Sequence, residues 1–124
     1  MALVSIGEDA NAARRAARIQ IAFYATTPSY KPILDLHGRG ALPRDLRRAF
    51  VSHDLDRMAE LIDDELLDAI AIAGRSDEAP DRLRAWESVA DRVILGMPWY
   101  GLDRARQRRA IDAALDLGAR LVRD

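Results

Sequence analysis

The side chains of this 124-residue chain that could carry chemistry are scattered, and few have the spacing that a known kind of site requires. His37 and His53 lie sixteen positions apart and the chain has no cysteine, so the ligand spacing of a zinc site is missing. The carboxylates of Asp63, Asp64 and Glu65 resemble the start of a helix more than a general acid–base pair. Residue type and spacing alone therefore predict neither a metal site nor a catalytic residue.

Nucleotide loops and a catalytic triad are not indicated either. The chain has no Gly-x-Gly-x-x-Gly or Walker-type loop, and the Gly-Arg-Gly at residues 38–40 lacks the preceding strand that either motif needs. Ser5, Ser52 and His53 do not define a Ser-His-Asp triad by spacing.

Three side chains in predicted loops remain as candidates for contact with a small molecule. Arg75 follows an apolar run and is placed either to meet an anion or to face solvent. Trp99 and Tyr100 follow Pro98 and either wall an apolar pocket or seal one end of the fold.

The elements that must position these side chains are strand–helix units. In the central stretch, residues 66–95, an apolar run at 69–73 stops at Gly74, and a second apolar run closes the unit at 93–95. Unbroken apolar runs of this length are typical of parallel strands covered on both faces. Between them we predict a helix capped by Ser76, joined to the strands by a right-handed crossover. Its apolar stripe consists of Leu83, Trp86 and Val89.

The same pattern begins at the first residue of the chain. An apolar run at 2–6 precedes an alanine- and arginine-rich helix that ends near residue 25, and the last helix opens at Asp103. Between the first and second units we predict short helices, one starting at Pro43, one capped by Asp54 and one led by residues 63–65. The predicted buried stripe of the last helix is Ile111, Ala114, Leu115, Gly118 and Leu121 or Val122.

The fold predicted is therefore one helix-rich α/β domain over residues 1–124. It consists of a strand–helix unit (1–25), a helical insertion (26–65) and two further strand–helix units (66–124). The predicted strands are residues 2–6, 69–73 and 92–95.

Charge and hydropathy exclude several partners. The net charge is −1 with 31% charged residues, which does not favour nucleic-acid binding. No apolar run approaches about 18 residues and the start lacks the basic and apolar regions of a signal peptide, so we predict a cytoplasmic chain that does not bind membranes.

Two segments resemble a known family. Residues 21–38 (IAFYATTPSYKPILDLHG) resemble the stretch after the sixth strand in deazaflavin-dependent oxidoreductases of the luciferase-like monooxygenase superfamily. Residues 71–78 (AIAGRSDE) are similar to the Gly-Thr-Pro-Asp-Glu turn after the seventh strand, although Arg75 and Ser76 stand where that turn has Thr and Pro.

The resemblance implies that the chain is the last three units of a (β/α)8 barrel. In such a barrel the active face lies at the carboxyl ends of the strands, which places Arg75, Trp99 and Tyr100 at its mouth. The insertion that carries Tyr30 and His37 shapes the substrate side in the family. The family's cofactor is coenzyme F-420, a deazaflavin, or in relatives FMN, and its chemistry is hydride transfer to or from a small organic substrate.

Two functions remain open from the sequence. In the first, the chain is the C-terminal part of such an oxidoreductase and is catalytic only when the other barrel units are supplied. In the second, it is a non-catalytic α/β protein, without cofactor, that homodimerises to cover its sheet edges. Both hypotheses predict a partner, which is either the missing barrel or a second copy.

Overall fold

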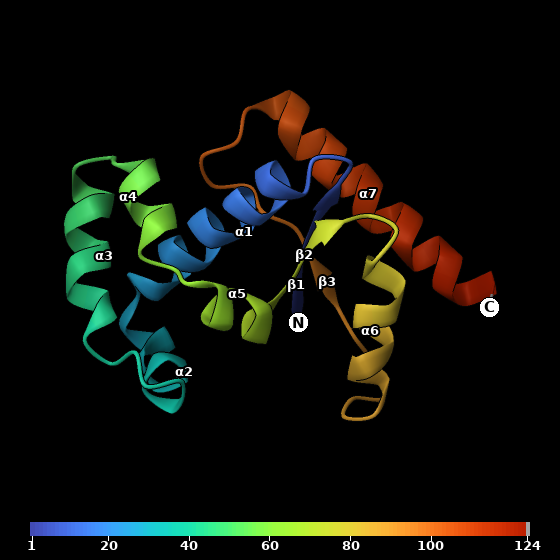
Figure 1. Ribbon diagram of the computed structural model, residues 1–124, viewed down its shortest axis with the longest axis horizontal. Helices are drawn as coiled ribbons and strands as arrows, with labels where there is room; N and C mark the ends of the chain where they lie inside the picture. Colours follow the sequence, from blue (N-terminus) through green and yellow to red (C-terminus); the bar gives the residue numbers. More distant parts are fainter. Residues whose placement is uncertain (124) are drawn as a thin grey trace.

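Three short parallel strands form the centre of the computed structural model, which describes residues 1–123 (Figure 1). The strands are β1 (Ala2–Gly7), β2 (Ala71–Arg75) and β3 (Leu95–Gly96). A 3₁₀ turn, η1 (Pro28–Tyr30), and seven helices complete the part of the chain that is described. The helices are α1 (Ala10–Ala25), α2 (Lys31–Leu36), α3 (Leu42–Val51), α4 (Leu55–Glu60), α5 (Asp64–Ile70), α6 (Ala79–Glu87) and α7 (Arg104–Arg123).

Aspartate side chains cap the starts of four helices. Asp9, Asp54, Asp63 and Asp103 accept hydrogen bonds from backbone N–H groups in the first turns of α1, α4, α5 and α7. Such caps satisfy amide groups that have no partner within the helix. The predicted cap at Asp54 is confirmed, and α3 begins at Leu42, one residue before Pro43.

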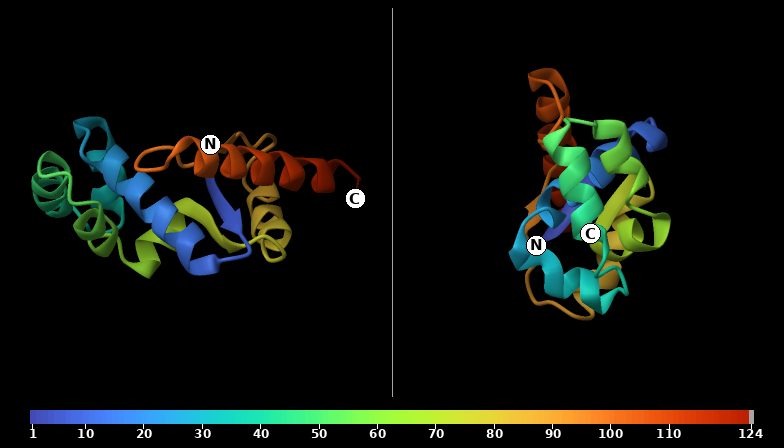
Figure 2. Two further views of the ribbon diagram at one scale, coloured as in Figure 1. Left: turned by 90° about the horizontal axis from the view of Figure 1, so that it is seen from above. Right: turned by 90° about the vertical axis from the view of Figure 1, so that its left-hand side faces the viewer.

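The strand order is β2-β1-β3, and it explains why helices cover both faces of the sheet. The chain moves from β1 to β2 through α1, then reverses past β1 to reach β3 through α6. Because crossovers between parallel strands are right-handed, a reversal of direction moves the connecting helix to the opposite face. Accordingly α1 lies on one side of the strands and α6 and α7 on the other (Figures 1 and 2). Leu3 and Ala73 belong to the apolar cluster with α1, whereas Val4 and Ile72 pack with residues of α6 and α7.

This arrangement differs from the predicted last three units of a barrel. Consecutive barrel strands would lie in the order β1-β2-β3, with all helices on the outer face. Three strands cannot close into a barrel, so the face that would line its interior would be left in water. In this structure Leu83 of α6 and Leu117 of α7 bury that face instead, and the architecture is a small doubly wound α/β layer.

Several predicted boundaries are wrong, each because tertiary packing overrides the local apolar pattern. Residues 69 and 70 end α5 rather than begin a strand, and β3 is shorter than the predicted 92–95. Ser76 does not cap α6, because the helix starts two residues later, after Glu78. The Ser76 backbone N–H instead donates to the Gly7 carbonyl (3.2 Å) and ties this turn to β1. Val89 lies beyond α6 and is 79% exposed, so it is not part of the apolar stripe.

The predicted stripe of the last helix is also only partly correct. Ala114 is buried and Leu121 packs against the core, but the strongest contact is Leu117, which is 2% exposed. Three predicted members lie on the outer side of α7, where Ile111 is 39%, Leu115 66% and Val122 89% exposed. The helix therefore keeps a second apolar face that nothing in the described chain covers.

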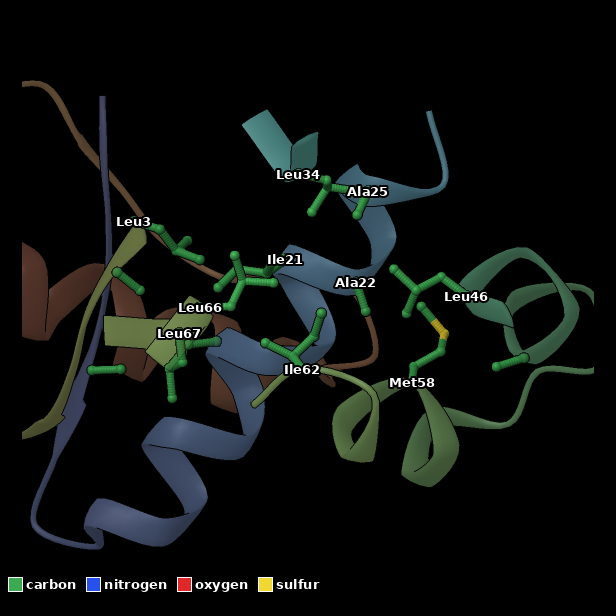
Figure 3. Close-up of a cluster of buried hydrophobic side chains, with 14 residues drawn as sticks. Leu3, Ile21, Ala22, Ala25, Leu34, Leu46, Met58, Ile62, Leu66 and Leu67 are labelled. Carbon is green, nitrogen blue, oxygen red and sulfur yellow. The ribbon is translucent and has the colours of Figure 1, made fainter. Parts of the chain in front are cut away.

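The main core lies between the sheet, α1 and the short helices (Figure 3). Leu66 and Leu67 of α5 are almost fully buried beside Ile62, and Met58 meets Leu46 where α4 packs on α3. The helical insertion is thus anchored on α1 and not on the sheet. Within residues 1–123, no helix is both long enough and apolar enough to cross a membrane.

Candidate functional site

The loops after β1 and β3 leave a crevice at the carboxyl edge of the sheet. One loop turns toward α1 on one face and the other toward α7 on the opposite face, so the chain diverges at this point. In open α/β sheets this kind of divergence is where ligands bind. The crevice has a volume of about 390 Å³, and Gly7, Glu8 and Asp9 form one wall while Arg106 and Arg109 of α7 form the other.

Few groups in the crevice are free to do chemistry. The Ser5 hydroxyl donates to the Ala13 carbonyl (2.7 Å), and Asp9 accepts the Ala12 N–H (3.0 Å). Arg109 is exposed and has no ion-pair partner within residues 1–123, which leaves its guanidinium available to an anion. Among the described residues, the crevice thus sets the guanidinium groups of Arg106 and Arg109 opposite the carboxylates of Glu8 and Asp9, beside an apolar wall, and no buried proton donor or acceptor is aimed into it. Across residues 1–123, no three His, Asp or Glu side chains cluster as a metal site.

The five predicted substrate-side residues are not brought together. Arg75 lies at the carboxyl end of β2, where its guanidinium pairs with Asp77 (3.0 and 3.1 Å) on the surface. Trp99 and Tyr100 fold back on α1, and the Tyr100 ring stacks on Phe23 with centroids 4.3 Å apart. Neither aromatic side chain lines the crevice.

Tyr30 and His37 lie still farther from the carboxyl edge. The Tyr30 ring stacks on Tyr24 (centroids 5.3 Å apart) and lines a cavity near the amino end of β1. His37 ends α2, and its carbonyl accepts a hydrogen bond from Arg39 (3.2 Å). The roles predicted for these residues remain predictions, because the structure does not assemble them around one ligand.

Sequence reasoning missed a network of arginine and aspartate side chains on the free edge of β2. Arg14 of α1 donates to Asp68 (2.8 Å), to Asp64 (2.7 Å) and to the Ala73 carbonyl (3.3 Å). Arg82 of α6 donates to the same carbonyl (3.1 Å). An uncovered strand edge invites pairing with another chain, so these guanidinium groups protect β2.

The sequence did contain a signal for this network. Arg14 and Arg18 are four residues apart in α1, and Asp64 and Asp68 are four residues apart in α5, so each pair lies on one helix face. Arg18 also pairs with Asp64. Only the packing of α5 against α1 shows that the two faces meet.

Hydrogen bonds and nearby guanidinium groups favour the ionised form of the aspartates around α5. The Leu66 N–H, which donates to Asp63 (2.8 Å), and then Arg39 lower the pKa of Asp63 below its usual 3.8. The hydrogen bond from Arg14 is the main cause of the lowered pKa of Asp64.

We therefore expect stability to fall in acid. A lowered pKa in the folded state contributes stability that is complete above the unfolded value, near 3.8, and is lost as pH falls through the folded value. The urea concentration at the midpoint of unfolding should be constant from pH 7 to about 5 and decline steadily below about pH 4. Asp77, whose pKa is lowered by Arg75, adds to the same decline.

Asp63→Asn is the matched variant for this pH profile. Asparagine also caps helices well, so the bond to the Leu66 N–H can persist while the charge opposite Arg39 is lost. The variant should show a shallower acid decline than the wild type. Identical pH profiles of the two proteins would mean that the charge of Asp63 does not contribute to the loss of stability in acid.

Comparisons with known proteins agree on one family. The model described as luciferase-like monooxygenase matches residues 1–92. An uncharacterized protein of Mycobacterium tuberculosis is 44% identical over 84 residues, which are 67% of this chain and 25% of that protein, and one of Mycobacterium bovis matches equally. The 5,10-methylenetetrahydromethanopterin reductase of Archaeoglobus fulgidus is 30% identical over 116 residues, covering 89% of this chain and 34% of the reductase.

The matched region therefore spans only a quarter to a third of these curated relatives. No solved structure gives a significant match.

Proposed function

Because the chain belongs to the luciferase-like monooxygenase family, we propose that it is the C-terminal section of a deazaflavin-dependent oxidoreductase. In this proposal the complete protein transfers hydride to or from a small organic substrate. The remaining strand–helix units come from a longer precursor or from a separate chain. The observation that carries the proposal is the similarity to a named reductase over 89% of this chain.

The crevice at the carboxyl edge fits one part of such a cofactor. Arg106 and Arg109 stand at its rim opposite the carboxylates of Glu8 and Asp9, and Arg106 also pairs with Asp103 (3.7 Å). The exposed guanidinium of Arg109 suits the phosphate of coenzyme F-420 or FMN. The cofactor's ring system would supply the hydride chemistry when bound. The described residues of the crevice offer no buried hydrogen-bonding group to orient that ring, since the Ser5 hydroxyl is already bonded to Ala13. This chain would therefore contribute a phosphate contact, and the other units would hold the ring.

The uncovered face of α7 supports the need for a partner. Leu95, Met97, Ile111, Leu115 and Val122 line an apolar groove of about 650 Å³ beside the free edge of β3. Exposed apolar patches of this kind mark interaction sites. We propose that the missing strand–helix units cover it, since the relatives are three to four times longer than the matched region.

The second candidate is a non-catalytic homodimer. The same α7 groove favours it, because two copies of one helix face can cover each other about a two-fold axis. The two candidates differ in whether the cofactor binds. They also differ in which partner covers the apolar face of α7: the remaining strand–helix units or a second copy of the chain.

The test combines light scattering with a fluorescence titration of coenzyme F-420 on one sample. The purified chain is measured alone and after co-expression with the part of the Mycobacterium tuberculosis relative that lies outside the 84-residue match. We expect no binding by the chain alone and saturable binding by the complex. In the complex, Arg106→Gln combined with Arg109→Gln should weaken binding about tenfold, as expected for losing charge-assisted phosphate contacts.

Each other outcome has a definite meaning. Tight binding by the chain alone would overturn the claim that the missing units hold the cofactor. A stable dimer that never binds F-420, alone or after co-expression, would replace the proposal with the homodimer.

A further inference from the structure

A second cavity lies at the opposite end of the sheet from the crevice. It has a volume of about 140 Å³ and sits between the end of α1, the turn η1 and α2, beside the amino end of β1. Its walls are almost entirely apolar, and no charged side chain among residues 1–123 lines it. The walls include Leu3, Ile21, Tyr24, Ala25, Tyr30 and Leu34.

The local structure explains why this space is not filled. Pro28 opens the turn after α1, and the Tyr24 and Tyr30 rings stack almost parallel, with an interplanar angle of 5°. This stack packs the turn η1 against the last turn of α1. Ala25 lines the space with a single methyl group, and Figure 3 shows Leu34 beside it.

This cavity is apolar and opens to the surface beside Met1 and Ile33, which are 69% and 42% exposed. Protein interiors contain few spaces larger than a water molecule, and an apolar space does not hold water well because water finds no hydrogen-bond partners there. An engineered apolar cavity of about 150 Å³ in another protein stays dry and binds benzene. The cavity here has a similar volume and apolar walls, but it is open on one side.

We propose that this cavity is a binding site for a small, neutral aromatic molecule with one ring. The ring would contact Leu3, Ile21 and Leu34, and the edge of the Tyr24–Tyr30 stack provides the aromatic contact. A charged ligand is disfavoured because the walls are mostly apolar and, among the described residues, no charged side chain lines them. The site lies outside the crevice and uses none of its residues, so it stands whether or not the proposed oxidoreductase function holds.

The test is a protein-detected NMR titration of the chain with toluene and with p-cresol. We expect saturable shifts of the methyl groups of Leu3, Ile21 and Leu34, and of the Tyr24 and Tyr30 rings. Shifts confined to α7, or shifts that do not saturate, would overturn the proposal.

Two variants and a control decide whether toluene and p-cresol bind in this cavity. Ala25→Leu fills the space and should weaken binding at least tenfold, while Ala85→Leu adds the same atoms at an exposed position of α6 and should leave binding unchanged. If Ala25→Leu does not fold, Ile33→Asp gives the same answer, because Ile33 lines the cavity yet is 42% exposed and tolerates change. It places a carboxylate at the mouth and should weaken binding about fivefold. Unchanged affinity in the folded filling variant would contradict the proposal.

Discussion

Replacing Gln20 by methionine is expected to lower the free energy of unfolding by about 1 to 3 kcal/mol, because two backbone donors lose their acceptor while a buried donor without a partner among the described residues, the Gln20 Nε2, is removed. Gln20 is fully buried in α1, and its Oε1 accepts the backbone N–H groups of Trp99 (2.8 Å) and Tyr100 (2.9 Å). Methionine has a similar shape but no comparable acceptor. Urea unfolding measures the loss, and amide hydrogen exchange at residues 99 and 100 should become faster.

Gln107→Met is the matched control for this prediction. Gln107 lies on α7, and its Nε2 donates to the carbonyls of Trp99 (3.1 Å) and Leu102 (3.0 Å) in the same loop. Those carbonyls can bond to water when the side chain is removed, so we expect a loss below about 1 kcal/mol. If both variants were equally stable and residues 99 and 100 stayed protected, Gln20 would not hold the loop.

Truncating Tyr100 to alanine is the second large expected effect. The Tyr100 ring stacks on Phe23 (4.3 Å) and also approaches Phe50 (5.9 Å), joining the loop after β3 to α1 and α3. Because the ring is only partly buried, we expect a loss of about 2 to 4 kcal/mol, somewhat below the 3 to 5 typical of a core aromatic. Thermal or urea unfolding of the purified chain measures it.

Tyr100→Phe separates packing from a polar role. It keeps the ring and removes the hydroxyl, so stability should stay within about 0.5 kcal/mol of the wild type if the residue seals the fold. A loss as large as that of the alanine variant would instead assign the effect to the hydroxyl. The sequence left both interpretations of Tyr100 open, and its stack on Phe23 favours sealing.

The dependence of stability on pH and the arginine–aspartate network both concern the outer edge of β2, which pairs with no strand among the described residues. The Ala73 carbonyl is covered by Arg14 and Arg82, and Arg14 is in turn held by Asp64 and Asp68. Protonating Asp64, whose pKa is lowered mainly by the hydrogen bond from Arg14, weakens one of the ion pairs that position Arg14. The edge is therefore best protected at neutral pH, where a second strand would meet guanidinium groups rather than a free carbonyl.

The family, the strand–helix pattern and most helix starts were determined by the sequence alone. Short-range patterns predict features that depend only on neighbouring residues. Examples are the apolar run after Met1, the cap at Asp54 and the helix after Asp103. The segments at 21–38 and 71–78 carried the resemblance, and the family match includes both.

Only the tertiary structure decided the strand order and the position of the predicted site residues. Local sequence does not say on which side of β1 the last strand pairs, and β3 pairs there through only two residues. That choice sends α6 and α7 across the face of Val4 and Ile72 and opens the crevice beside Gly7. It also leaves Leu115 in solvent, because a helix with two apolar faces can bury only the one that meets the sheet.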